Sequence, residues 1–356
     1  MTSDASYKDL AAALDRLPNG FPRTASGVEL EILRRIFSPE EASLAGRLGG
    51  TPESVEVIAE RAGLPVTEAR ERLNALAERG LIWGWLAGDE LRFRLAPFIV
   101  GIYEARAVPM DHEYAHLIEE YLAEGGAAGI MQPQPALHRV IPAQGAVKTE
   151  WILPYDDVRA ILAAAKTFHV EDCICRVQQD RIGRRCDFPL LNCLSFSAHS
   201  RPPRPGDISR EEALAVLERA EEIGLVHTVS NVIQGVGYVC NCCGCCCSLL
   251  RGITDWGIEN SVACANYYAT VEAEACSGCG ICMKRCQVRA IAVFDGVAKV
   301  DRTKCIGCGL CATGCPGEAA KLRRKPEAEI VEPPMDFAQW ERERRRNRGL
   351  EGRGST

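Results

Sequence analysis

Apolar residues recur at helical spacing between residues 26 and 80, and then alternate with polar ones up to residue 96. Ser38, followed by Pro39, Glu40 and Glu41, is typical of a capped helix start. The pattern predicts helices over about 28–37, 39–48, 51–62 and 67–80, followed by two short strands around Gly88 and Asp89.

This order of helices and hairpin resembles a winged helix-turn-helix domain, which we expect over residues 26–100, after a lead-in over residues 1–25. Such domains often bind DNA. Between Glu29 and Arg94, however, twelve acidic residues stand against nine arginines. Duplex binding needs a basic surface, so we favour a docking or structural role and keep DNA binding as the alternative.

The next two segments are expected to differ in character. Residues 101–150 are expected to form a helix from Asp111 to Glu124 and then a linker rich in Gly, Pro and Gln. His112 and His116 lie four apart, but with no third ligand nearby we assign them no role. Residues 151–265 read as a cysteine-rich α/β domain with helices over 156–166 and 209–223, and strands over 168–175 and 225–232.

The end of the chain, residues 323–356, is charged and reads as a solvated arm that could dock a partner. No apolar run approaches the length of a membrane span, and the start of the chain lacks the pattern of a secretory signal. The net charge of −6 argues against general nucleic-acid binding. We expect a cytoplasmic protein of 356 residues with several domains.

Cysteine is the compositional outlier. The chain has 19 cysteines, none of them before Cys173. In a reducing compartment these stay thiols, so their density indicates metal binding rather than a disulfide scaffold.

Eight of the cysteines form two copies of one spacing, C-x-x-C-x-x-C-x-x-x-C. Two-residue spacers let one loop supply three thiolates to an iron–sulfur cubane, while the fourth ligand comes from the other copy. We therefore assign one [4Fe-4S] cluster to Cys276, Cys279, Cys282 and Cys315, and a second to Cys305, Cys308, Cys311 and Cys286.

Residues 266–322 resemble the bacterial two-cluster ferredoxins, which implies a ferredoxin fold and one-electron transfer with redox partner proteins. One residue departs from that family, because Gln287 stands where proline usually follows the fourth cysteine. Zinc is the alternative occupant, since C-x-x-C pairs also bind zinc. The double repeat favours iron–sulfur clusters.

Eleven further cysteines lie upstream. Cys173 and Cys175 are expected on one face of a strand, and the remaining nine are Cys186, Cys193, Cys240, Cys242, Cys243, Cys245, Cys246, Cys247 and Cys264. We predict at least one additional metal site here, with iron–sulfur ahead of zinc and reduced structural thiols as the alternative. The run CNCCGCCC is too dense for one cubane, so its thiols should divide between sites, one of them including Cys264.

Two smaller features accompany these cysteines. Cys242, Cys243 and Gly244 resemble, over those residues alone, the Cys-Cys-Gly motif of heterodisulfide-reductase-like proteins, whose clusters act on sulfur substrates. Arginines crowd the same region and could offset the charge of anionic clusters or receive an acidic partner: Arg176, Arg181, Arg184, Arg185, Arg201 and Arg204.

The sequence thus predicts a multidomain α+β protein with a winged-helix-like front, a cysteine-rich α/β middle domain and a two-cluster ferredoxin module, of the kind found in 4Fe-4S binding proteins of anaerobes. The leading function is electron transfer. The alternatives are a redox-sensing DNA-binding regulator and an oxidoreductase whose middle cluster binds substrate. GVGYVC has too few glycines for a flavin or nucleotide loop.

Overall fold

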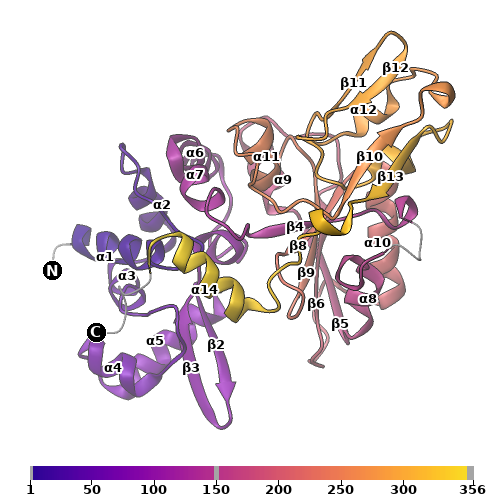
Figure 1. Cartoon of the computed structure of the whole chain (residues 1–356). Coiled ribbons are helices and arrows are strands. Elements are labelled where there is room, and N and C mark those ends of the chain that lie inside the picture. The colour runs from indigo at the N-terminus through magenta and orange to yellow at the C-terminus, as the bar shows by residue number, and fades with distance from the viewer. Residues whose placement is uncertain (1–2, 148–151, 351–356) are drawn as a thin grey trace. The chain divides into compact units, whose positions relative to one another are not determined.

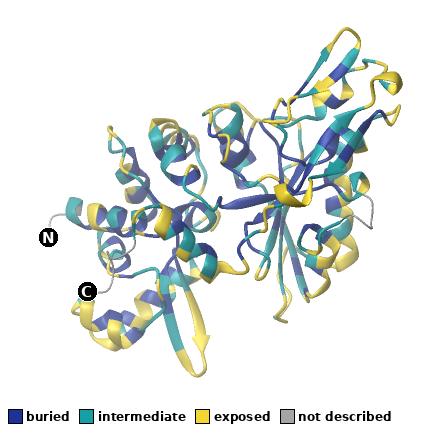
Figure 2. Ribbon diagram, in the orientation of Figure 1, coloured by how far each residue is buried: buried dark blue, intermediate teal, exposed yellow. Residues whose placement is uncertain are grey.

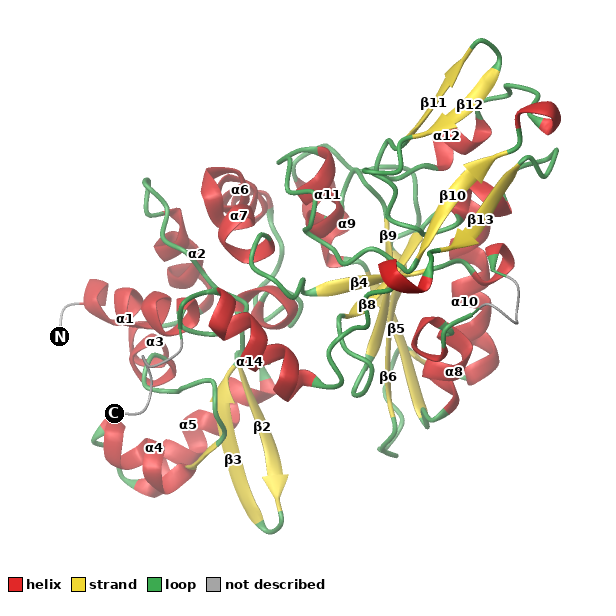
Figure 3. Cartoon of the chain, in the orientation of Figure 1, coloured by secondary structure: helices red, strands yellow, loops and turns green. Residues whose placement is uncertain are grey.

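The computed structural model describes residues 3–147 and 152–350. The chain forms two compact units, one of residues 1–133 with 341–356 and the other of residues 134–340 (Figure 1). Helices dominate the first unit, whereas the second is built on a sheet (Figure 3). Within the described residues, no helix combines the length and the apolar character needed to cross a bilayer. The finer division into six segments stays a prediction.

The first unit contains the predicted succession of helices and hairpin. Its elements are α1 (Ser3–Asp15), α2 (Val28–Ile36), α3 (Pro39–Ala45), β1 (Glu53–Ser54), α4 (Val55–Ala62), α5 (Val66–Glu78), β2 (Ile82–Ala87) and β3 (Glu90–Leu95). Ser38 caps α3 in a capping box with Glu41, because each side chain accepts a hydrogen bond from the other residue's backbone N–H. The three strands pair antiparallel in the order β1-β3-β2.

The segments before and after this part belong to the same core. Phe21 has no exposed surface, and its ring centroid lies 4.7 Å from that of Phe98 and 5.0 Å from that of Tyr121. Tyr121 ends α6 (His112–Tyr121), which is followed by α7 (Ala127–Met131). Residues 1–25 are therefore more than a lead-in, since aromatic packing joins them to α6. The rings of His112 and His116 meet edge to face on α6, with centroids 4.4 Å apart.

The expectation of a solvated C-terminal arm is wrong. Residues Phe337–Asn347 form α14, and the fully buried Arg344 donates hydrogen bonds to the backbone carbonyls of Pro18, Ile130 and Pro133. Charge composition suggested a solvated segment, but a guanidinium with several fixed donors can satisfy carbonyls that helix ends and turns leave unpaired.

The second unit is built on an antiparallel sheet with strand order β4-β8-β9-β6-β5-β7. Its strands are β4 (His138–Ile141), β5 (Thr167–Asp172), β6 (Leu191–Ser197), β7 (Asp207–Ile208), β8 (Val226–Ser230) and β9 (Tyr238–Cys242). The expected linker over 125–145 is wrong at its end, because all four residues of β4 are buried and pair with β8. Only Val140 and Ile141 of β4 are apolar, and Pro and Gln residues lie on both sides of the strand, so the sequence pattern did not show it.

Strand alternation gives this sheet two chemically different faces. Phe168, Leu194 and Val239 pack with α8 (Val158–Ala163) and α10 (Arg210–Ile223) on one face. Cys193 pairs with Cys240 in register, and neighbouring residues of a strand point to opposite faces. The thiols of β6 and β9 therefore lie on the face opposite α10. Leu194 and Val239 are buried, whereas Cys193 and Cys240 are half-buried. Figure 2 shows burial along the whole chain.

Cys173 and Cys175 do not lie on a strand, in contrast to the prediction. β5 ends at Asp172 after a register shift, Cys173 is the N-cap of α9 (Ile174–Arg181), and Cys175 lies in its first turn. The apolar alternation continues from β5 into α9, so periodicity alone did not show the boundary. Cys247 likewise is the N-cap of α11 (Ser248–Thr254).

The C-terminal part of this unit consists of two similar halves. β10 (Tyr267–Val271) pairs with β13 (Ala320–Arg324), and β11 (Ile291–Phe294) pairs with β12 (Val297–Val300). Each cysteine motif runs from a loop into a short helix, either α12 (Ile281–Arg285) or α13 (Leu310–Thr313). The repeat seen in the spacing of the cysteines is thus a repeat in structure.

Arg344→Met should loosen the first unit, because it leaves three backbone carbonyls without their donor. We expect the free energy of local opening to fall by about 3 kcal/mol in the peptides that cover Pro18 and residues 127–133. Hydrogen exchange read by mass spectrometry measures this change. The exposed Arg342→Met, two residues earlier on α14, is the matched control. Equal exchange in both variants would contradict the anchoring role.

Candidate iron–sulfur and thiol sites

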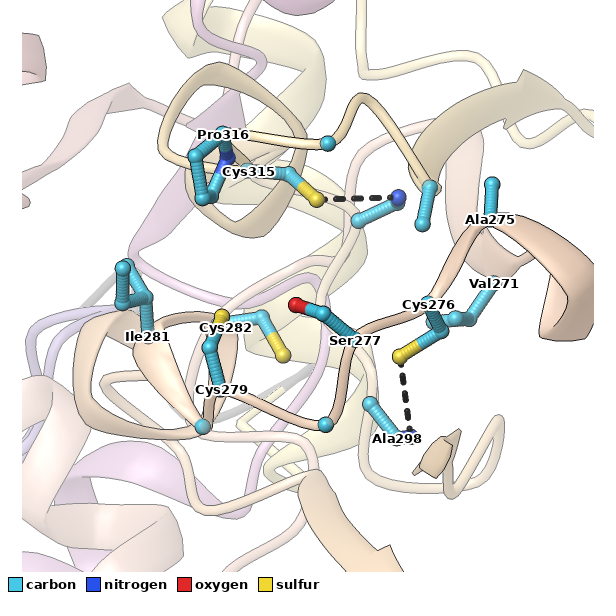
Figure 4. A pocket seen from close by; sticks show the side chains of 15 residues that line it. Val271, Ala275, Cys276, Ser277, Cys279, Ile281, Cys282, Ala298, Cys315 and Pro316 are labelled. Carbon is cyan, nitrogen blue, oxygen red and sulfur yellow. Dashed lines mark hydrogen bonds between the residues drawn. The ribbon is translucent and has the colours of Figure 1, made fainter. Parts of the chain in front are cut away.

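The first cysteine cavity lies within residues 266–322, which we call the ferredoxin-like part. Four thiols line it, those of Cys276, Cys279, Cys282 and Cys315 (Figure 4). Three come from the first motif, and Cys315 is the last cysteine of the second. Cys279 is exposed, so this cavity reaches the surface of the unit.

The second cavity has the complementary composition. Cys305, Cys308 and Cys311 line it together with Cys286 from the first motif. The two cavities are similar in size, with about 380 and 330 Å³ of empty space when the adjoining open solvent is included. Two matched spaces, each with four thiols, fit two occupants of one kind.

Glycines let the loops approach these cavities closely. Gly278 has φ +67°, and a Cβ there would lie 2.4 Å from the carbonyl oxygen of Gly296. Gly307 has φ +74°, and its Cβ would lie 2.4 Å from the carbonyl oxygen of Tyr267. Only glycine fits both the left-handed backbone and the contact.

Backbone N–H groups point at several of the sulfurs. Ala290 donates to Cys286 Sγ over 3.1 Å, while Ala298 donates to Cys276 and Ala320 to Cys315, each over 3.4 Å. The last two are drawn in Figure 4. Such donors stabilise negative sulfur and tune the potential of a bound cluster. Burial raises the pKa of Cys311 to about 12, so this thiol would ionise at neutral pH only against a metal.

The middle region brings four thiols into direct contact. Cys186 Sγ lies 3.5 Å from that of Cys246 and 3.8 Å from that of Cys243, and the sulfurs of Cys246 and Cys245 are 3.8 Å apart. All four sulfur atoms lie within 4.8 Å of one another. We call this group the thiol tetrad. Hydrogen bonds from Cys186, Cys245 and Cys246 lower the pKa of Cys243 strongly, and the nearby Arg176 lowers it further.

A second group, the thiol ring, consists of Cys173, Cys175, Cys242 and Cys247. The Cys175 thiol interacts with the thiols of Cys173 and Cys247, and the Cys242 thiol also interacts with that of Cys247. The fourth side of the ring is an electrostatic interaction between Cys173 and Cys242. Hydrogen bonds from Cys240 and Cys247 lower the pKa of Cys242 to about 6. Cys193 and Cys240 extend the ring along the sheet.

Arg176 lies between the two groups. It is fully buried and donates to the carbonyls of Asn241 over 2.8 Å and Pro189 over 3.2 Å, but its Nε has no partner. Burial lowers the pKa of Arg176, and the thiols of Cys243, Cys173 and Cys242 raise it by more. No carboxylate of the described residues pairs with it. A buried guanidinium needs a negative partner, and here only ionised sulfur can supply it. The middle thiols therefore fit a bound metal better than a set of neutral thiols.

The remaining predicted residues lie outside these groups. Cys264 is exposed and belongs to neither the tetrad nor the ring, so the prediction that it completes a middle site is not supported. Arg201 pairs with Asp207 at 2.6 Å, Arg204 pairs with the same carboxylate at 3.8 Å, and Arg185 pairs with Asp180 at 3.6 Å. Of the arginines singled out in the sequence, Arg176 is the one placed among the cysteines.

Gln287 connects the two cysteine regions, which sequence reasoning missed. Its side-chain carbonyl accepts from Gly244 N over 2.9 Å, and its amide donates to the carbonyl of Gly224 over 2.8 Å. A Cβ on Gly244 would lie 1.9 Å from the backbone oxygen of Gln287. The departure from proline was the available signal. Arg285 strengthens the junction by donating to the carbonyls of Glu221 and Glu222 at the end of α10.

Paired cysteine motifs around matched cavities are the mark of an iron–sulfur protein. Residues 269–316 match the family model described as a 4Fe-4S dicluster domain. No curated protein and no solved structure matches the chain. The matched domain and the cysteine groups support an iron–sulfur electron-transfer role, and a ferredoxin-like domain implies redox partners in general.

Gln287→Ala should loosen the contact between the ferredoxin-like part and the loop around Gly244. Two lost hydrogen bonds amount to about 1 to 2 kcal/mol, or roughly tenfold faster amide exchange in peptides covering 284–291 and 240–247. The exposed Met283→Ala on α12 serves as the control. If Gln287→Ala exchanges no faster than this control, Gln287 does not hold the junction.

Proposed function

We propose that this protein transfers electrons through two [4Fe-4S] clusters in residues 266–322 and one further cluster in the middle region. Each cluster would supply a one-electron redox centre. The observation that carries the proposal is the pair of matched cavities, each lined by three cysteines of one motif and the fourth of the other.

The thiol ring is the better candidate for the further cluster. It joins the N-terminal ends of α9 and α11, where free backbone N–H groups favour anionic sulfur. Arg176 would offset part of the charge, because Cys173 and Cys242 of the ring act on it. Cys242 and Cys247 are buried, which favours electron storage or relay over direct reaction with a substrate.

The order of the sites follows from their surroundings. Cys286 of the second cavity precedes Gln287, which binds the loop that carries Cys242 and Cys247. Cys279 of the first cavity is exposed. We infer that electrons pass between the middle region and the second cavity, and leave or enter at the first, where a partner protein can approach. A reducing compartment keeps dense cysteines available as metal ligands, so we propose a cytoplasmic location.

DNA-dependent regulation is a weaker candidate. The exposed α5 would be the recognition helix of a winged helix, but Arg70 pairs with Glu56 at 3.2 Å and Arg72 pairs with Glu68. These pairs leave little positive charge for phosphate. We propose instead that this winged-helix-like part serves protein docking.

The exchange of the fourth cysteine can be tested with paired substitutions in the full chain. In anaerobically prepared protein, Cys276→Ala with Cys315→Ala should lose about four irons, no more than either single variant, because both thiols serve one cluster. Cys276→Ala with Cys286→Ala should lose about eight. Iron and acid-labile sulfide analysis gives the counts. The reverse pattern would show that each motif keeps its own fourth ligand.

The further cluster has its own test. Cys247→Ala should lower the iron and sulfide content from about twelve of each to about eight, with the EPR signals of the other two clusters retained. Cys264→Ala, an exposed cysteine outside both middle groups, should change neither count. Eight irons in the unsubstituted chain would rule out a middle cluster and leave the ferredoxin-like part as the only redox site.

A further inference from the structure

The thiol tetrad differs from the other cysteine sites in its spacing. Its sulfurs lie 3.5 to 3.8 Å apart where they touch. Four thiolates around one zinc ion, at Zn–S distances of about 2.3 Å, stand about 3.8 Å apart at the corners of a tetrahedron. The tetrad therefore has the size of a single-ion site.

The ferredoxin-like cavities provide an internal comparison. A cubane places each of its four cysteines on a different iron, so those sulfurs must stand farther apart than the ligands of one ion. Among the described residues, the tetrad alone has three or more ligand atoms all within 4.8 Å. In the first cavity, the thiol of Cys282 interacts with those of Cys276, Cys279 and Cys315 through charge alone.

We propose that Cys186, Cys243, Cys245 and Cys246 bind one zinc ion. Binding would release to solvent the protons that these thiols still carry and form four Zn–S bonds to thiolates, with no change of oxidation state. The resulting site carries a net charge of −2, and Arg176 beside Cys243 offsets half of it. Four cysteine ligands leave no open position, which is typical of a structural zinc site rather than a catalytic one.

The proposed ion has a definite structural task. Cys186 follows α9, whereas the other three ligands belong to the loop between β9 and α11. The ion would fasten these two segments together. The same loop contains Gly244, whose N–H binds Gln287 next to Cys286. The tetrad would thus fix the loop that contacts the ferredoxin-like part. It would take up no electrons, because zinc does not change oxidation state.

The inference goes beyond the proposed electron transfer and can fail separately from it. Full-length protein, expressed with iron and zinc both in excess and purified anaerobically, should contain about one zinc per chain in addition to its iron and sulfide. X-ray absorption at the zinc edge should show four sulfur neighbours at about 2.3 Å and no iron neighbour. Absence of zinc, or an iron–iron distance assigned to this site, would overturn the proposal.

Substitution identifies the ligands. Cys186→Ser should remove the zinc while iron, sulfide and the EPR signals stay, and it should speed amide exchange around Gln287. Cys264→Ser is the matched control and should keep the ion. If Cys186→Ser instead loses about four irons and four sulfides, the tetrad holds a cluster. If the variant does not fold, the absorption spectrum of the unsubstituted protein still decides.

Discussion

The arrangement of the second unit depends on burying many sulfur atoms that must carry negative charge. A thiolate in a dry interior is strongly unfavourable unless a metal, a hydrogen-bond donor or a cation stands beside it. The chain offers all three kinds of support. Backbone N–H groups reach Cys276, Cys286 and Cys315, and Arg176 lies among the middle thiols with its Nε unpaired. Bound metal would complete a charge balance that the protein alone leaves open.

This requirement also explains why distant segments come together. Each ferredoxin-like cavity joins cysteines from both motifs, so neither half encloses its own occupant. In the middle region, the segment from Cys173 to Cys186, which includes α9 and the loop after it, and the segment from Cys242 to Cys247 both contribute to the tetrad and to the ring. Loss of metal should therefore affect several elements at once, as expected where metal binding supplies folding energy.

Some of this could be predicted from sequence because the signal is local. The capped start of α3 at Ser38 and the two cysteine motifs each depend on a few residues that are close in sequence. The structure contains both the capping box and the two cysteine-lined cavities. The strand expected through Cys175 and the arm expected beyond residue 323 failed for another reason. The conformation of both segments depends on residues that are distant in sequence. The chain changes from β5 to α9 at the cysteine face, and Arg344 donates hydrogen bonds to carbonyls of residues more than 200 positions away. Composition and periodicity contain no information on such partners.

The same reasoning applies to the division of the middle cysteines. Density in the run from Cys240 to Cys247 indicated more than one site, but not which thiols belong together. Strand alternation brings Cys240 and Cys242 to one face of β9, and the turn that follows points Cys243, Cys245 and Cys246 toward Cys186.

Gln287 connects this group of cysteines to the ferredoxin-like part. In the usual ferredoxin-like position a proline has no side-chain donor or acceptor to offer, whereas the glutamine amide binds both Gly244 and Gly224. Gln287 departs from the usual motif, and its side chain holds the ferredoxin-like part against the loop that carries the middle cysteines. A ferredoxin that works alone has no need of such a contact, so the departure itself favours an internal relay between the two regions.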